Sequence, residues 1–211
     1  MTPRTKEQNE DIRLRRLAQI RKAAADVFLN KGALLEIRDV AAQAGLGYGT
    51  VYHYYSNKGD LLNDLLWDAL DRAGRWLEAP RVNPGTTDSE SVSLERAAAA
   101  GVRLLQLWAE DHSVYLLYKL AGEGFASLPE GRSSPLSNAF RQEVLTPFAA
   151  LLETGSAAEG AAASGGNAAE SPDKLQRAEM LLAAMTGCAS LSLRRGKLHE
   201  EAGDIARLLK F

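Results

Sequence analysis

The residues best suited to binding chemistry gather in one short segment, residues 48–55, which holds four tyrosines and one histidine. Tyrosine and threonine hydroxyls and an imidazole ring form hydrogen bonds that suit phosphate oxygens and base edges, and no acidic residue stands among them. Because consecutive side chains point in different directions around a helix, at least two of the four aromatic residues at 52–55 must be exposed. We expect Tyr55 to point inward. The alternative interpretation is that the aromatic side chains mainly fill a small three-helix core.

Two short helices are expected to position this segment. Apolar residues at helical spacing predict the first helix over residues 37–44, and Gly45 ends it because glycine readily adopts the positive φ of a sharp turn. Leu46 would fill the corner, and Val51 would hold the second helix, residues 48–55, against its neighbours. Two short helices joined by a three-residue turn form a helix-turn-helix, which can present its second helix to the DNA major groove.

Over residues 12–66 the chain resembles the TetR-type (tetracycline-repressor-like) transcriptional regulators. The resemblance is carried by Ala24-Ala25-Asp26-Val27-Phe28 with Gly32, Ile37-Arg38-Asp39-Val40-Ala41, Ala44-Gly45-Leu46, Gly49-Thr50-Val51-Tyr52, and Asn57-Lys58 before Leu61-Leu62. The chain departs from the family pattern at three helix starts, one of them at Gly59, which replaces a common acidic residue in the first turn of the helix after Asn57. Leu35 and Glu36 stand where the family usually has Thr or Ser, and Gly47 replaces Ser as the cap of the second short helix.

The resemblance implies a set of DNA-contacting residues in and around the second short helix. They are Arg38, Tyr48, Gly49, Thr50, Tyr52, His53, Tyr54 and Lys58. Lys58 looks like a phosphate ligand that is helped by the N-terminal dipole of the following helix. Arg38 could instead be a solvated charge, His53 an ordinary surface histidine, and Tyr54 a packing residue.

The charge distribution agrees with an anionic partner at one end of the chain. Ten basic and seven acidic residues stand up to Asp60, whereas fifteen basic and twenty acidic residues follow it. The 211-residue chain is 45% hydrophobic, as in soluble globular proteins. It has a single cysteine, and we find neither a signal peptide nor a membrane-spanning run, which predicts a cytoplasmic protein.

The rest of the sequence predicts an all-α fold of about nine helices, because helical spacing recurs and strand alternation is absent. The expected organisation is an N-terminal three-helix helix-turn-helix head, residues 1–57 with a basic N-terminal arm, followed by a larger helical effector-binding and dimerisation domain, residues 58–211. Residues 155–173 lack bulky side chains and are expected to form a flexible loop. The helices are expected at about 12–31, 37–44, 48–55, 57–80, 94–120 with a break near 111, 135–154, 174–195 and 200–210.

The two closing helices are expected to pair two copies of the chain, since a single helix-turn-helix reads only a few base pairs of a palindrome. The interface residues follow a heptad-like spacing: Leu175, Ala178, Leu182, Met185, Ala189, Ile205 and Leu208. Leu181, Cys188 and Leu191 lie alongside, and Ala183, Ala184 and Gly187 would permit close helix approach. The alternative is that these stripes face the core of their own chain.

By the same resemblance, the central helices would enclose a small-molecule effector of unknown chemistry. The candidate wall residues are Trp67, Trp108, His112, Tyr115, Tyr118, Phe140 and Phe148, and for each of them ordinary core packing is the alternative. The helix from Lys58 would carry the change to the head. No cofactor, metal site or catalytic residue is expected, because the three histidines are far apart in sequence and no catalytic motif occurs.

These patterns predict a dimeric, sequence-specific DNA-binding transcriptional regulator, a repressor that a small molecule releases, rather than an enzyme. Its expected partners are double-stranded DNA with a palindromic operator, a second copy of the chain and the effector, with no membrane. The alternatives are a helical protein-interaction module and an all-α enzyme whose helix-turn-helix is only structural.

Overall fold

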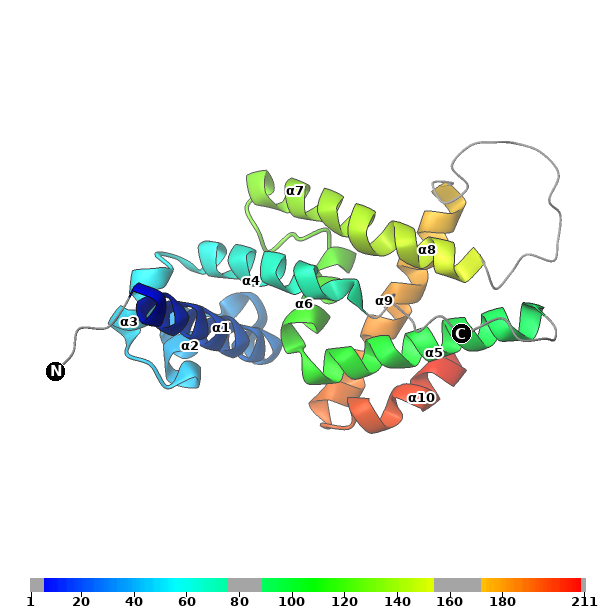
Figure 1. The fold of residues 1–211 in the computed structure, drawn as a ribbon, viewed down its shortest axis with the longest axis horizontal. Coiled ribbons are helices and arrows are strands. Elements are labelled where there is room, and N and C mark those ends of the chain that lie inside the picture. Colours follow the sequence, from blue (N-terminus) through cyan, green and yellow to red (C-terminus); the bar gives the residue numbers. More distant parts are fainter. Residues whose placement is uncertain (1–5, 76–88, 154–171, 210–211) are drawn as a thin grey trace.

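The computed structural model describes residues 6–75, 89–153 and 172–209, and every regular element in these ranges is a helix (Figure 1). The all-α prediction is therefore confirmed. The segment predicted as a flexible loop, residues 155–173, lies almost wholly outside the described residues. The helix that begins near residue 57 ends at Ala73, before the predicted end near residue 80. Across the described ranges, no helix is long and apolar enough to cross a membrane.

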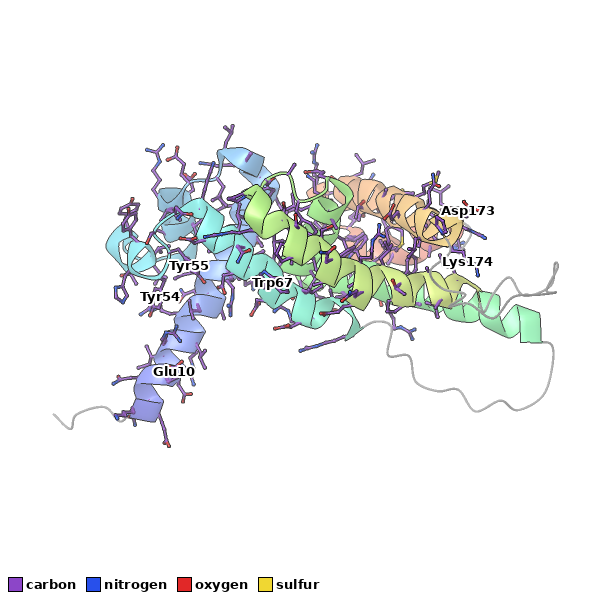
Figure 2. All side chains as sticks on the ribbon, turned by 90° about the horizontal axis from the view of Figure 1, so that it is seen from above. Glu10, Tyr54, Tyr55, Trp67, Asp173 and Lys174 are labelled. Atoms are coloured by element: carbon purple, nitrogen blue, oxygen red, sulfur yellow. The ribbon has the colours of Figure 1, made fainter. Side chains whose placement is uncertain are left out.

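The head consists of α1 (Lys6–Lys31), the 3₁₀ turn η1 (Gly32–Leu34), α2 (Ile37–Ala44) and α3 (Tyr48–Tyr54). Helix α1 starts six residues earlier than predicted. Its first ten residues are exposed, so the apolar spacing that predicted the helix could not reveal them. Figure 2 shows this beginning of α1, marked by Glu10, projecting beyond the other helices.

Helix α2 compensates for its unusual start. The backbone N–H of Glu36 donates to the Asp39 carboxylate over 3.2 Å, so a side chain three residues into the helix satisfies a donor at the start. Lys31 Nζ lies 2.7 Å from the same carboxylate and ties the end of α1 to α2. At the other end Gly45 has a φ of 64°, as the sharp turn requires.

Helix α4 (Lys58–Ala73) leads from the head into the body and begins directly after its cap, Asn57, as predicted. The Asn57 side chain accepts the backbone N–H of Asp60 over 2.9 Å. The predicted break near residue 111 is also confirmed: α5 (Ser89–Glu110) ends before Asp111, whose carboxylate caps α6 (His112–Gly122) by accepting the N–H of Ser113 over 3.0 Å.

The stretch predicted as one helix over 135–154 begins earlier and has an irregular middle. It comprises α7 (Glu130–Phe140), the π-helical turn η3 (Arg141–Leu145) and α8 (Thr146–Glu153). The π-helical turn comes just before Pro147, which lacks an N–H and cannot donate to the carbonyl of Glu143. Pro147 therefore coincides with a widened turn but does not end the helix.

The body closes with α9 (Pro172–Arg194) and α10 (Leu198–Leu208), joined by a turn in which Gly196 has a φ of 67°. Helix α10 packs along α5, and α9 packs on α6 and α8. Helix α6 lies at the centre and contacts α1, α4, α5 and α9. Because α1 of the head packs directly on α4 and α6, head and body share one continuous hydrophobic core.

Candidate nucleic-acid interface

The two faces of α3 differ sharply in exposure. Val51 is fully buried and Tyr55, just after the helix, is 5% exposed, whereas Tyr48 and Tyr52 are 53% and 49% exposed. The rings of Tyr48 and Tyr52 stack on one another with centroids 5.6 Å apart. Of the four aromatic residues at 52–55, Tyr52 and His53 are exposed and Tyr55 is buried, as expected.

Tyr55 fastens α3 to the rest of the head. Its hydroxyl donates a short hydrogen bond to the Asp64 carboxylate on α4, and Arg21 of α1 lies 3.1 Å from the same carboxylate. Burial, reinforced by the neighbouring Asp64 charge, raises the pKa of Tyr55 far above its ordinary value, so the phenol remains a hydrogen-bond donor. This anchoring of Tyr55 to α4 holds the outer face of α3 in a fixed orientation.

A groove of about 670 Å³ runs between the outer face of α3 and the starts of α2 and α4. Four of the predicted DNA-contacting residues line it together: Arg38, Tyr48, Tyr52 and Lys58. Gly49 and Thr50 are exposed beside them on α3. Figure 1 shows α3 at one end of the molecule.

The structure separates two predicted residues from the groove. His53 is exposed and Tyr54 is half-buried, and their rings meet edge to face with centroids 5.5 Å apart. Neither lines the groove. Figure 2 labels Tyr54 and Tyr55 at the junction of α3 and α4.

The cations of the groove have partners within the chain that the sequence did not reveal. Arg38 Nε lies 2.7 Å from the Glu36 carboxylate, and Lys58 Nζ donates to the carbonyl of Ala33 over 2.7 Å. The Arg38–Glu36 ion pair is at the surface, where such pairs contribute only about 0–1 kcal/mol, and the hydrogen bond of Lys58 to the backbone is exposed as well. A phosphate could therefore replace either partner at little cost, and Glu36 is the single acidic residue that lines the groove.

The predicted effector residues do not form one wall. Trp108 and Phe148 are fully buried in the core, whereas Trp67 of α4, labelled in Figure 2, is 36% exposed. Tyr118 and Phe140 line a cavity of about 460 Å³ between α6, α7 with η3, and α9. His112 and Tyr115 line a different cavity, of about 170 Å³, between α1, α6 and α9.

The larger cavity lies against a cluster of aromatic rings. Tyr118 contacts Phe140 edge to face at 5.3 Å and Trp108 at 5.0 Å, between ring centroids. Arg141 and Glu179 both line the cavity, and their charged groups form an ion pair 3.8 Å apart. The residues that α9 contributes, Glu179 and Met180 among them, were missed as cavity residues because the heptad-like pattern assigned that helix to an interface.

Tyr118 also connects this cavity to the head. Its hydroxyl donates to the carbonyl of Ala73, in the last turn of α4, over 2.9 Å. The other end of α4 carries Lys58, which lines the groove beside α3. Helix α4 therefore reaches from the cavity wall to the groove.

The predicted dimer residues require a correction. Of the seven, only Leu208 is exposed, at 73%. The other six are buried in the core of their own chain: Leu175, Ala178, Leu182, Met185, Ala189 and Ile205. Buried side chains cannot contact a second copy. The opposite face of α9 is exposed instead, with Met180 at 67%, Leu191 at 65%, and Ala183, Ala184 and Gly187 between them. The same helix has two apolar faces, and sequence periodicity could not tell which one packs inward.

Within the described ranges, no three histidine, cysteine, aspartate or glutamate side chains come together as a metal site would require.

Residues 20–65, from the second half of α1 into α4, match the family model described as bacterial regulatory proteins, tetR family. Over 115 residues the chain is 27% identical to the HTH-type transcriptional repressor KstR2 of Mycobacterium tuberculosis, which covers 54% of each protein. The chain thus spans about half the length of the curated relative that it matches.

Solved structures share the fold of the whole chain. A TetR-like transcriptional regulator from Rhodococcus sp. RHA1 has a TM-score of 0.60 at 21% identity and covers 92% of this chain and 93% of its own. The fatty acid degradation regulator FadR from Bacillus halodurans has a TM-score of 0.60 at 18% identity, covering 92% and 94%. FadR from Bacillus subtilis, in complex with stearoyl-CoA, has a TM-score of 0.52 at 20% identity, covering 91% and 96%.

At these identities the structural matches establish the fold alone, whereas the family model matches the helix-turn-helix itself. The two findings agree with the resemblance that the residues around α3 carry. The helix-turn-helix segment therefore matches the tetR family of bacterial regulatory proteins, and the chain shares the fold of TetR-like regulators.

Proposed function

We propose that this protein is a transcriptional repressor that binds a palindromic DNA operator as a dimer and leaves it when a small molecule occupies the body. The observation that carries the proposal is the groove beside α3, where two stacked, exposed tyrosines stand between Arg38 and Lys58. A face of hydrogen-bonding aromatic groups flanked by cations is suited to base edges and phosphates. DNA as partner also fits the predicted cytoplasmic location.

In this account some residues around α3 contact phosphates and others contact base edges. Arg38 and Lys58 exchange their present partners for phosphates, which sets the register of the head on the duplex. Tyr48, Gly49 and Thr50 begin the recognition helix and approach the base edges, while Tyr52 contacts bases or phosphates from the next turn. His53 and Tyr54, outside the groove, are assigned to the flanking backbone.

Dimerisation would use the exposed face of α9 rather than its buried face. Met180, Ala184, Gly187 and Leu191 follow each other at intervals of four, three and four residues, so they form one stripe along the helix. Leu208 of α10 lies exposed nearby in the closing pair of helices. Small residues in the middle of the stripe allow two helices to approach closely. Four helices, two from each copy, would place the heads about 34–36 Å apart or a multiple of that spacing.

The effector would occupy the cavity of about 460 Å³ beside Tyr118 and Phe140. Its volume lies within the range of about 300–1,000 Å³ that small-molecule sites have. An effector that displaced Tyr118 would disturb its hydrogen bond to the carbonyl of Ala73 and so shift α4. The first residue of α4, Lys58, lines the DNA groove. Such a ligand releases DNA only by binding the shifted arrangement more tightly than the DNA-bound one. Because one structural neighbour holds stearoyl-CoA, fatty acyl-CoA esters are the first probes to try.

A salt titration tests the proposed DNA binding. The affinity of the full chain for a labelled random-sequence duplex is measured by fluorescence anisotropy at increasing salt concentration. Counterion release predicts that the logarithm of the affinity falls linearly with the logarithm of salt concentration. The Lys58→Ala variant should reduce the slope by about one, since one phosphate contact is lost.

The matched control is Lys197→Ala, which removes an equal charge from the turn between α9 and α10, far from α3. It should bind as the parent does. Equal slopes for the Lys58→Ala variant and the parent would place the DNA contact elsewhere. No binding to duplex at low salt would favour the protein-interaction or enzyme alternatives.

A further inference from the structure

A second cavity, of about 170 Å³, lies where the head meets the body and shares no lining residue with the proposed effector cavity. Asp26 and Asn30 of α1 contribute from the head. His112 and Lys119 of α6 and Arg194 at the end of α9 contribute from the body. Five polar or charged side chains from three helices therefore converge on one small space.

The charges in this cavity are not balanced. Lys119 and Arg194 make no ion pair or hydrogen bond within the described part of the chain. Asp26 is the one acidic residue in the lining, and its carboxylate already accepts a hydrogen bond from His112 Nδ1 over 2.7 Å. Two half-exposed or exposed cations thus face a space in which the single carboxylate is engaged, so the cavity has an excess of positive charge.

Neutral hydrogen-bonding groups complete the lining. The Tyr115 side chain is 2% exposed, and its hydroxyl makes a long contact of 3.3 Å to the carbonyl of Thr186 and a hydrogen bond with the Ser190 side chain. Burial raises the pKa of Tyr115, so its hydroxyl stays protonated and able to donate. The Ser190 hydroxyl lines the same wall. The Asn30 amide donates one hydrogen to the carbonyl of Asp26 and keeps a second.

We propose that this cavity is a binding site for a small oxyanion, a phosphate or carboxylate group, held by Lys119 and Arg194 with Tyr115 and Ser190 at its inner wall. Arginine and lysine are the side chains that bind such groups, arginine with two parallel N–H donors and lysine as a point charge. The volume is below the range of drug-sized ligands, which fits a small anion or the anionic end of a metabolite. Glu123, whose charge also acts on Tyr115, does not line the cavity.

The position of the site gives the anion a consequence, which rests on the proposed function. An anion held by α6 and α9 also contacts the end of α1, so it favours the arrangement of head and body that encloses it. The anion would therefore alter DNA affinity without entering the cavity beside Tyr118. Binding of the anion to the free protein does not depend on DNA, so the two claims can be tested separately.

The test measures the binding of inorganic phosphate and of succinate to the full-length protein by isothermal titration calorimetry at constant ionic strength. The parent should bind at least one of them, and the Lys119→Met/Arg194→Met variant should bind about a hundredfold more weakly, with about tenfold for each lost cation. The charge-conserving Lys119→Arg/Arg194→Lys variant should retain most of the affinity, which shows that a loss comes from charge rather than misfolding. Lys197→Met is the matched control, because it removes a cation three residues beyond Arg194 and outside the lining.

Binding of neither anion at millimolar concentration, or equal binding by the parent and the Lys119→Met/Arg194→Met variant, would overturn the proposal. A separate measurement of duplex affinity with and without the anion examines the coupling. If the anion binds at this site but no duplex is bound at all, the proposed DNA function fails while the site stands. If duplex binds and the anion does not, the site fails while the DNA function stands.

Discussion

Helices α3 and α9 each turn one face inward and one face outward, and their outer faces differ in chemistry. The outer face of α3 carries Tyr48 and Tyr52, large rings with hydroxyl groups that remain about half exposed. The outer face of α9 carries Ala183, Ala184 and Gly187 between two exposed apolar side chains. The first face offers hydrogen bonds and the second offers only close approach.

The difference indicates what each face would bind. A polar, aromatic surface beside Arg38 and Lys58 is suited to a hydrated, anionic partner such as duplex DNA. A stripe of small apolar residues is suited to another helix, because it loses little polar solvation when covered. The inner faces differ less, since both are buried in the core, although that of α3 also carries the Tyr55 hydroxyl bonded to Asp64. The outer faces are therefore the ones that distinguish two functions within one all-α chain.

The largest expected effect comes from charging the outer face of α9. Gly187→Glu places a carboxylate at the centre of the proposed dimer interface, while a Cβ at Gly187 meets no atom of its own chain within 4 Å. The dimer should dissociate, and operator affinity should fall about a hundredfold or more, because a single helix-turn-helix loses its partner half-site. Light scattering coupled to size exclusion and anisotropy with a selected operator measure the two effects.

Gly131→Glu is the control for that substitution. Gly131 is also an exposed helical glycine with free space around its Cβ position, but it lies on α7. It should leave mass and affinity unchanged. A Gly187→Glu protein that remains a dimer would show that the exposed stripe of α9 is not the interface.

The second effect concerns the link between body and head. Tyr118→Phe keeps the ring in the cavity wall but removes its hydrogen bond to the carbonyl of Ala73. Binding of an acyl-CoA probe should change little, whereas release of DNA by that probe should weaken about tenfold, since one hydrogen bond couples the wall to α4. Titration of the probe into a labelled protein–duplex complex measures release. Unaltered release would mean that the coupling follows another path.

The third effect is on the inner face of α3. Tyr55→Phe removes a buried hydroxyl that donates to Asp64, and the free energy of unfolding should fall by about 1–2 kcal/mol. Urea denaturation followed by circular dichroism measures it. Tyr48→Phe, which removes a hydroxyl from the exposed face, should leave stability unchanged. A similar loss in the free energy of unfolding for both variants would contradict the division of α3 into a buried inner face and an exposed outer face.

The smallest effect depends on pH. The hydrogen bond from Lys31 holds the pKa of Asp39 below its ordinary value of 3.8, so the charged form stabilises the fold. That contribution is present above the ordinary pKa and is lost as pH falls through the lower, folded value. Asp39→Asn should therefore make stability slightly lower near neutrality and less dependent on pH below about 4. Thermal unfolding at a series of acidic pH values measures this, and an unchanged pH profile would exclude the role of Asp39.

The head was more predictable from sequence than the body for physical reasons. Few residue types other than glycine suit the left-handed turn at Gly45, which indicated the end of α2. Few residue types cap a helix as well as Asn57, which indicated the start of α4. Because four consecutive aromatic residues, 52–55, point in different directions around a helix, some of their side chains had to be exposed. In the body, α9 is apolar on two faces, and the spacing of Leu182 is equally consistent with a core or an interface.

The cavities could not be predicted because they depend on helices that are distant in the sequence. Tyr118 and Tyr115 are three residues apart on α6, yet they line two different cavities. The partners of Arg38 and Lys58 in the groove depend likewise on local contacts that no spacing rule reveals. Sequence pattern specified the elements, and tertiary packing specified which side chains meet.

The central claim is that the outer face of α3 reads DNA, and the base preference of that face tests it most directly. Duplexes bound by the parent and by the Tyr48→Ala and Thr50→Ala variants are selected from a random pool and sequenced. The account predicts that both variants still bind but prefer different bases at one or two positions of each half-site. Selected sequences and affinities identical to those of the parent would contradict it.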